Sequence, residues 1–239
     1  MTKVDDAITR FLADLDQAGL GAYSAVLHGS AARGEWIAGQ SDINVVLVLE
    51  AIDTNVLERL QAPFRAWEQA GGALPLLLTR AEWLRSADSY PLEIAEMRTG
   101  YRVLRGEDPV AALRVRPADL RQALERDWRG KLLRLRQGYA LLNDDPATLG
   151  EFVRRSLPAI LFLARGTLVL AGQVPPRDSV ALAGALGALA GFDPDPVTRI
   201  ATRRADAGWR CTEGEMRGYL AAVEAAARYV DNLQIGDRG

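Results

Sequence analysis

The first hydrophobic pattern along the chain has the period of a helix. Apolar residues recur at spacings of three and four over residues 3–18, and Gly19 follows, which predicts an amphipathic helix that ends at this glycine. The next apolar segments are short and lack a helical period. Because β-branched and apolar runs of this kind are typical of buried strands, they predict strands at "YSAVLH" (23–28), "INVVLVLE" (43–50) and "ALPLLLT" (73–79).

Helical patterns separate and follow these strands. "SAARGEW" (30–36) has good helix formers behind a serine, and residues 53–70 place apolar side chains on one face between Asp53-Thr54 and a pair of glycines. Thr79 with Glu82 predicts a capping box for the next short helix. The apolar residues of segment 90–101 keep a helical spacing. They favour a helix there, and a strand is the alternative.

The pattern changes at residue 111. Beyond it the strand-like runs vanish, and five long helical segments follow one another with short connections. The sequence therefore predicts an α+β domain over residues 1–110 and an all-α helical bundle over residues 111–239. No fixed-period repeat and no low-complexity linker interrupts the chain.

Composition narrows the class of protein. Apolar residues make up 49% and charged residues 25% of the 239 residues, as in soluble globular proteins. The formal net charge of -2 gives no support for binding to nucleic acid. The acidic N-terminal segment does not resemble a secretory signal, the longest apolar runs are too short or too interrupted to span a bilayer, and the single Cys211 is compatible with the cytosol. A cytoplasmic protein without a membrane partner is expected.

The candidate chemistry lies between the first two strands. Gly29 lets the backbone approach a ligand closely, and Ser30 at the start of a helix offers its hydroxyl and nearby backbone N–H groups to a phosphate. Asp42 then opens the second strand. Two carboxylates at alternate positions of such a strand share a face and suit Mg²⁺ that bridges nucleotide phosphates.

The segment "HGSAARGEWIAGQSDIN" (28–44) resembles the signature of the nucleotidyltransferase superfamily, which has the polymerase-β-like fold. The resemblance implies a mixed sheet with flanking helices. The helical C-terminal half makes the chain similar to the antibiotic-type members. For the site, the resemblance implies that Gly29 and Ser30 bind the nucleotide and that Asp42 is a catalytic residue and a metal ligand. Arg33 is a further nucleotide-binding candidate, with simple exposure as the alternative.

The chain departs from that signature at the metal site. Asn44 stands where a second metal-binding aspartate is expected, and an amide oxygen is a weaker ligand for a hard cation than a carboxylate. The third strand contains no acid. Glu93 or Glu96 could replace the missing third carboxylate, although a solvated face or a helix cap is the simpler interpretation of each. His28 could reach a phosphate or fill the end of its strand.

Two functional hypotheses follow. In the first, the chain transfers a nucleoside monophosphate from an NTP to a hydroxyl of a small-molecule or protein acceptor, with an impaired site at Asp42 and Asn44 that binds Mg²⁺ weakly. In the second, it is a catalytically inactive module that binds a nucleotide or a partner protein. The resemblance names an enzyme, whereas the incomplete set of carboxylates argues against full activity.

Overall fold

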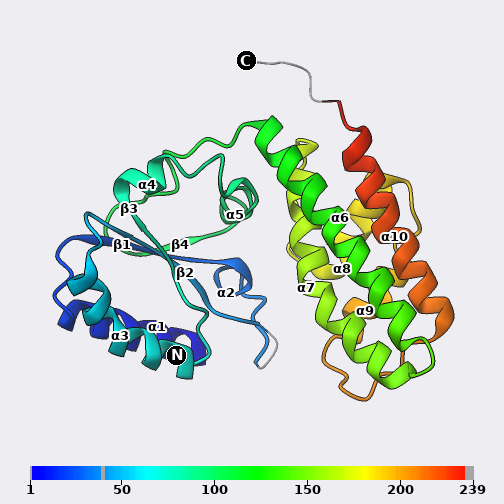
Figure 1. Cartoon of the computed structure of the whole chain (residues 1–239), viewed down its shortest axis with the longest axis horizontal. Helices are drawn as coiled ribbons and strands as arrows, with labels where there is room; N and C mark the ends of the chain where they lie inside the picture. Colours follow the sequence, from blue (N-terminus) through cyan, green and yellow to red (C-terminus); the bar gives the residue numbers. More distant parts are fainter. Residues whose placement is uncertain (1, 39–40, 235–239) are drawn as a thin grey trace. The chain divides into compact units, whose positions relative to one another are not determined.

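Four short strands form a mixed sheet in the N-terminal part of the chain (Figure 1). The computed structural model describes residues 2–38 and 41–234, and these form two compact units that divide between Val115 and Arg116. The elements of the first unit are α1 (Lys3–Gln17), β1 (Tyr23–His28), α2 (Gly29–Arg33), β2 (Asn44–Leu49), α3 (Thr54–Gln69), β3 (Leu76–Thr79), α4 (Arg80–Leu84), α5 (Pro91–Met97) and β4 (Arg102–Arg105).

The sheet has the strand order β3-β2-β1-β4. Strand β1 runs antiparallel to both β2 and β4, whereas β2 and β3 are parallel. In the register of the central pair, Tyr23 lies opposite Leu49 and His28 lies opposite Asn44. The end of β1 and the beginning of β2 are therefore neighbours, which brings the two halves of the sequence motif together.

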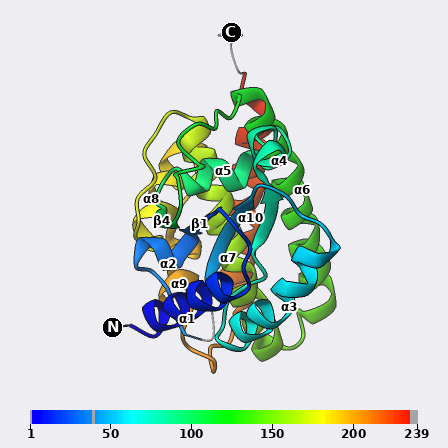
Figure 2. The ribbon, with the colours of Figure 1, turned by 90° about the vertical axis from the view of Figure 1, so that its left-hand side faces the viewer.

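Alternate side chains of the central strands enter two separate cores. One core contains Leu27 and Leu47 with apolar residues of α1 and α3, including Phe11 and Trp67, whose rings stack at 4.4 Å between centroids. The other contains Val26 and Val46 with residues of α4 and α5. Figures 1 and 2 show α1 and α3 together on one side of the sheet, with α4 and α5 on the opposite side. Because side chains alternate along a strand, His28 and Asn44 share the face of Val26 and Val46, which is the face that α5 covers.

Local sequence signals set most helix ends in this unit. The side chain of Asp53 caps α3, and Thr79 and Glu82 form the predicted capping box at the start of α4. Pro91 occupies the first turn of α5, which is a helix and not the alternative strand. The prediction for residues 30–36 was partly wrong, because α2 ends at Arg33. Gly34 follows with a left-handed φ of 79°, and this conformation stops the helix.

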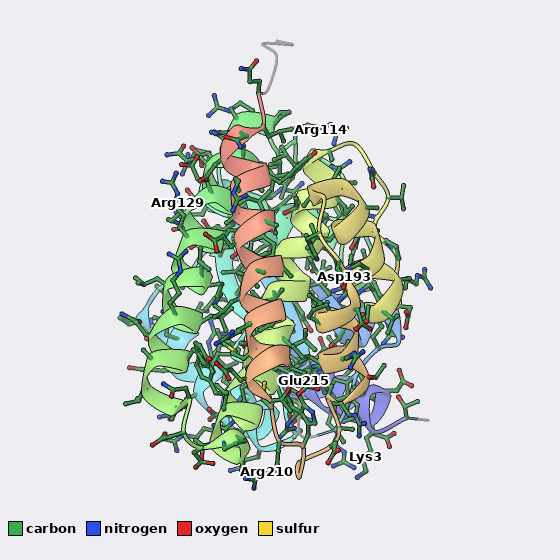
Figure 3. The ribbon with its side chains drawn as sticks, turned by 90° about the vertical axis from the view of Figure 1, so that its right-hand side faces the viewer. Lys3, Arg114, Arg129, Asp193, Arg210 and Glu215 are labelled. Carbon is green, nitrogen blue, oxygen red and sulfur yellow. The ribbon has the colours of Figure 1, made fainter. Side chains whose placement is uncertain are left out.

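The second unit is a bundle of helices. Its described elements are α6 (Pro117–Leu142), α7 (Pro146–Leu170), α8 (Ser179–Ala190), α9 (Asp195–Thr202) and α10 (Glu213–Asn232). Helix α10 contacts each of the other four, and Figure 3 shows it lengthwise beside α6. A buried hydrogen bond of 3.0 Å from the Trp128 indole to Thr167 joins α6 to α7. The predicted α+β domain with a mixed sheet, followed by a helical bundle, is confirmed.

A membrane-spanning helix needs a particular length and apolar character. In the part of the chain that the structure describes, no helix is both long enough and apolar enough to cross a membrane.

Candidate functional site

The Gly29–Ser30 turn joins the end of β1 to α2. His28 is the last residue of the strand and has extended backbone angles, and Gly29 then takes a left-handed φ of 74°. A Cβ atom at Gly29 would lie 3.0 Å from the Asn44 amide nitrogen. Conformation and space therefore both favour glycine here, because other residues are strained in the left-handed region.

The two candidate metal ligands have different surroundings. Asp42 precedes β2 and is exposed to solvent. Asn44 begins β2 opposite His28, is half-buried, and packs its amide against Gly29. The motif thus places one exposed carboxylate before the strand and one neutral amide beside the turn.

A buried carboxylate from α5 lies at the same place. Glu96 is only 4% exposed, and its Oε1 atom accepts a short hydrogen bond from Arg33 Nη1. Its other oxygen, Oε2, lies 3.8 Å from Nδ1 of His28. Ile94 and Met97 anchor α5 in the core against the sheet, which fixes the position of the Glu96 side chain. The Glu96 carboxylate therefore lies next to His28, which precedes the turn, and Arg33, which follows it.

Arg33 has a second acidic partner. Its Nε atom donates to Oε2 of Glu35 at 3.1 Å, and its side chain is only 6% exposed. The aliphatic part of the side chain lies against Gly100, where a Cβ atom would come within 3.1 Å of Arg33 Cγ. Arg33 is consequently held between two carboxylates and is not the exposed residue of the alternative interpretation.

The environment of Glu96 keeps it ionised. Burial raises the pKa of this carboxyl, but the nearby His28 imidazole and the charge and hydrogen bond of Arg33 outweigh burial. The pKa of Glu96 is therefore lowered from its ordinary value of 4.5. At neutral pH the network contains a buried negative charge with a guanidinium as its direct partner.

The donor set does not match the magnesium site that the resemblance implies. Mg²⁺ prefers carboxylate oxygens, and here Asp42 is a carboxylate while Asn44 supplies only an amide. Oε1 of Glu96 is engaged by the Arg33 guanidinium, whose charge repels a metal ion, and Oε2 lies 3.8 Å from Nδ1 of His28. Among residues 2–38 and 41–234, no group of three or more His, Cys, Asp or Glu side chains could hold a metal ion.

The structure brings most of the residues singled out in the sequence to one place. Gly29, Ser30 and Arg33 form the turn and α2, and Asn44 lies against Gly29. The interpretation of Glu96 as a solvated or capping residue was wrong, because its side chain is buried against Arg33. The spacing of apolar residues does not reveal this burial, because α5 is buried on nearly all sides, at Pro91, Leu92, Ile94, Ala95, Glu96 and Met97.

The chain has the fold of a protein of known structure. No model of a known protein family and no curated protein matches the chain. Among solved structures, the chain is similar to the spectinomycin adenyltransferase AAD(9) of an Enterococcus, determined with ATP and spectinomycin. The TM-score is 0.57 at 12% sequence identity, over 95% of this chain and 99% of the other. At this identity the similarity shows the fold alone, and that fold is the one an antibiotic nucleotidyltransferase uses.

Proposed function

We propose that this chain, which has the fold of an antibiotic nucleotidyltransferase, binds a nucleoside triphosphate and is impaired in transferring its nucleoside monophosphate. The fold supports the first half of the proposal, because the turn that would bind phosphate is present with Gly29 and Ser30. One observation carries the second half. The amide of Asn44 packs beside Gly29, where the resemblance places a metal-binding carboxylate.

Nucleotide binding would rest on groups around the turn. Gly29 allows close approach of the backbone, Ser30 offers a hydroxyl, and Arg33 supplies a fixed guanidinium. The hydrogen bonds of Arg33 to Glu35 and Glu96 engage Nε and Nη1 and hold the guanidinium in place next to the turn. We expect ATP or another NTP as the ligand, in a protein of the cytoplasm, where these nucleotides are available.

Impaired transfer follows from the charge of the site. A unit charge at 4 Å contributes about 4 kcal/mol at an effective dielectric constant of 20. The replacement of a carboxylate by the amide of Asn44 removes an interaction of this size from any bound cation. Asp42 alone would then hold Mg²⁺ weakly, and we assign no step of a reaction to the metal.

The alternative function is active transfer of a nucleoside monophosphate to a hydroxyl of a small molecule. The observation in its favour is the fold shared with AAD(9), whose structure contains ATP and an antibiotic. In that case Asp42 would be the residue on which activity depends. A role in binding a partner protein without turnover is the remaining alternative, and the burial of Arg33 between two carboxylates is compatible with it.

A pyrophosphate-release assay separates these functions. The wild type is incubated with ATP, Mg²⁺ and a panel of hydroxyl acceptors that includes aminocyclitols, and Asp42→Ala serves as the inactive comparison. The proposal expects release by the wild type that hardly exceeds that of Asp42→Ala. Robust release that disappears in Asp42→Ala would contradict impaired transfer and establish the enzyme.

A further inference from the structure

Resting on the proposed function, we infer that Glu96 is a positioning residue of the nucleotide site. It holds Arg33 and His28 on the two sides of the Gly29–Ser30 turn and so determines where the cationic and N–H groups near the phosphates lie.

Burial of the Glu96 carboxylate costs free energy. Glu96 is 4% exposed on a short helix whose other buried residues include Leu92, Ile94 and Met97. A buried charge is expensive, and apolar residues of similar volume often replace buried ion pairs without loss of stability. Packing of α5 on the sheet therefore does not require a carboxylate at this position. A role in the adjacent turn gives a reason for it.

The two oxygens of the Glu96 carboxylate face different residues. Oε1 accepts from Arg33 on α2, and Oε2 faces His28 at the end of β1. The two contacted residues flank the turn in the sequence, and no backbone segment of α5 itself belongs to the turn. A single side chain thus fixes both flanks from outside.

The surroundings of Glu96 exclude a role as a metal ligand. A metal ligand needs an oxygen that faces open space, whereas the oxygens of Glu96 face a guanidinium and an imidazole. The guanidinium charge disfavours a cation at this position. Glu96 therefore does not replace the missing third carboxylate of the metal site.

The expected benefit is preorganisation. Arginine has many rotamers, and a ligand that must order one loses affinity. Glu96 and Glu35 hold Arg33 in one geometry before a ligand arrives. Loss of the Glu96 contact should raise the Kd for ATP about 10-fold, the order of magnitude for ordering a side chain of this size.

The first test uses the only histidine of the chain as a spectroscopic probe. In the tag-free protein, the imidazole C–H signals in a carbon–proton NMR spectrum report on His28 alone. Glu96→Gln should move these signals, and Glu96→Asp should move them less. Glu107→Gln is the matched control, because Glu107 also pairs with an arginine, Arg80 at 3.0 Å, but at the exposed surface. Unchanged His28 signals in Glu96→Gln would overturn the inference.

The second test is a double-mutant cycle on ATP affinity. Kd is measured by titration for the wild type, Glu96→Gln, Arg33→Gln and the double variant, each checked for native circular dichroism. If Glu96 acts through Arg33, Glu96→Gln raises Kd about 10-fold in the wild type and has little further effect in Arg33→Gln. If Glu96→Gln does not fold, Glu96→Asp keeps the charge and should raise Kd about 3-fold.

The outcomes separate the inference from the proposed function. If the wild type binds ATP and the Glu96 variants bind it equally well, the inference fails and the proposed function stands. The inference also fails if Glu96→Gln weakens binding equally with and without Arg33. If the wild type binds no ATP under any condition, the proposed function fails and the inference falls with it.

Discussion

Glu96 and Arg33 form an ion pair across 63 positions of the sequence, and the pair joins α5 to the helix that follows the Gly29–Ser30 turn. Both side chains are almost fully buried, at 5% and 6% exposure. The chain therefore has a fixed salt bridge beside the turn. The sequence alone predicts that Arg33 binds a phosphate or is exposed, and that Glu96 lies on a solvated face or caps a helix.

This pair should contribute to stability in a pH-dependent way. The pKa of Glu96 is lowered below 4.5 in the folded chain, so the unfolded chain binds a proton first as the pH falls. The stabilisation is present above about 4.5 and is lost as the pH falls through the folded value. At pH 7, the free energy of unfolding of Glu96→Gln should be about 2 kcal/mol lower than that of the wild type, since a hydrogen bond to a charged group contributes on this scale.

Urea unfolding between pH 3 and pH 7 measures this difference. The gap between the wild type and Glu96→Gln should stay constant down to about pH 4.5 and narrow below it. Glu107→Gln, which removes an exposed carboxylate, should show little change at pH 7. A gap that is absent at pH 7, or that widens on acidification, would contradict the assigned ion pair.

Gly29 should tolerate alanine less well than a glycine with a similar backbone angle elsewhere. Gly21 has a φ of 76°, and a Cβ atom added there would have no heavy atom within 4 Å, whereas a Cβ at Gly29 meets the Asn44 amide at 3.0 Å. Gly21→Ala should lower the free energy of unfolding by about 1 kcal/mol through backbone strain alone. Gly29→Ala should cost more, and equal losses in urea unfolding would show that the contact with Asn44 does not matter.

Restoring a carboxylate at position 44 should restore a dependence on metal. Asn44→Asp has nearly the same shape and adds a negative charge next to the turn, on the strand that Asp42 precedes. We expect Mg²⁺ to improve ATP binding at least about 10-fold in this variant, because an added carboxylate is a strong ligand for a hard cation. Asn55→Asp adds the same charge at an exposed position of α3 and is the control. The same response to Mg²⁺ in both variants would remove position 44 from the metal site.

Cys211 should be chemically inert in the folded protein. Burial, with a smaller contribution from the charge of Glu215, raises the pKa of the thiol to about 12. Since the thiolate is the reactive form, labelling by a disulfide reagent at pH 8 should be at least about 100-fold slower in buffer than in denaturant. The chain has no other cysteine, so the kinetics report this site alone. Rapid labelling of the folded protein would show that the thiol is accessible.

Local patterns in the sequence were sufficient for most of the fold. The short apolar runs without a helical period predict β1 and β2, and the Thr79–Glu82 pair predicts the start of α4, because each depends on neighbours in the chain. The extent of α2 was overestimated, since the left-handed conformation of Gly34 overrides the helix formers around it. The signature also predicts the Gly29–Ser30 turn, whose backbone geometry depends on local residues.

The remainder of the site depends on contacts between distant segments. Glu96 is buried because α5 packs on the sheet face that carries His28. The hydrophobic pattern within one segment does not show which face of the sheet a later helix will cover. The same is true of the contact between Asn44 and Gly29, which depends on the register of β1 and β2. The sequence therefore names these residues as candidates, but the solvated or capping environment that it predicts for Glu96 is wrong.

The central claim is that this site binds a nucleotide without the full set of metal ligands. Calorimetric titration of the wild type with ATP, in about 5 mM EDTA and then at millimolar Mg²⁺ (roughly the excess needed to saturate a weak site), tests it most directly. The account predicts measurable binding in both conditions, with a Kd that changes by less than about 3-fold on addition of Mg²⁺. Absence of binding, or a Kd that falls more than about 10-fold with Mg²⁺ and requires Asp42, would contradict it.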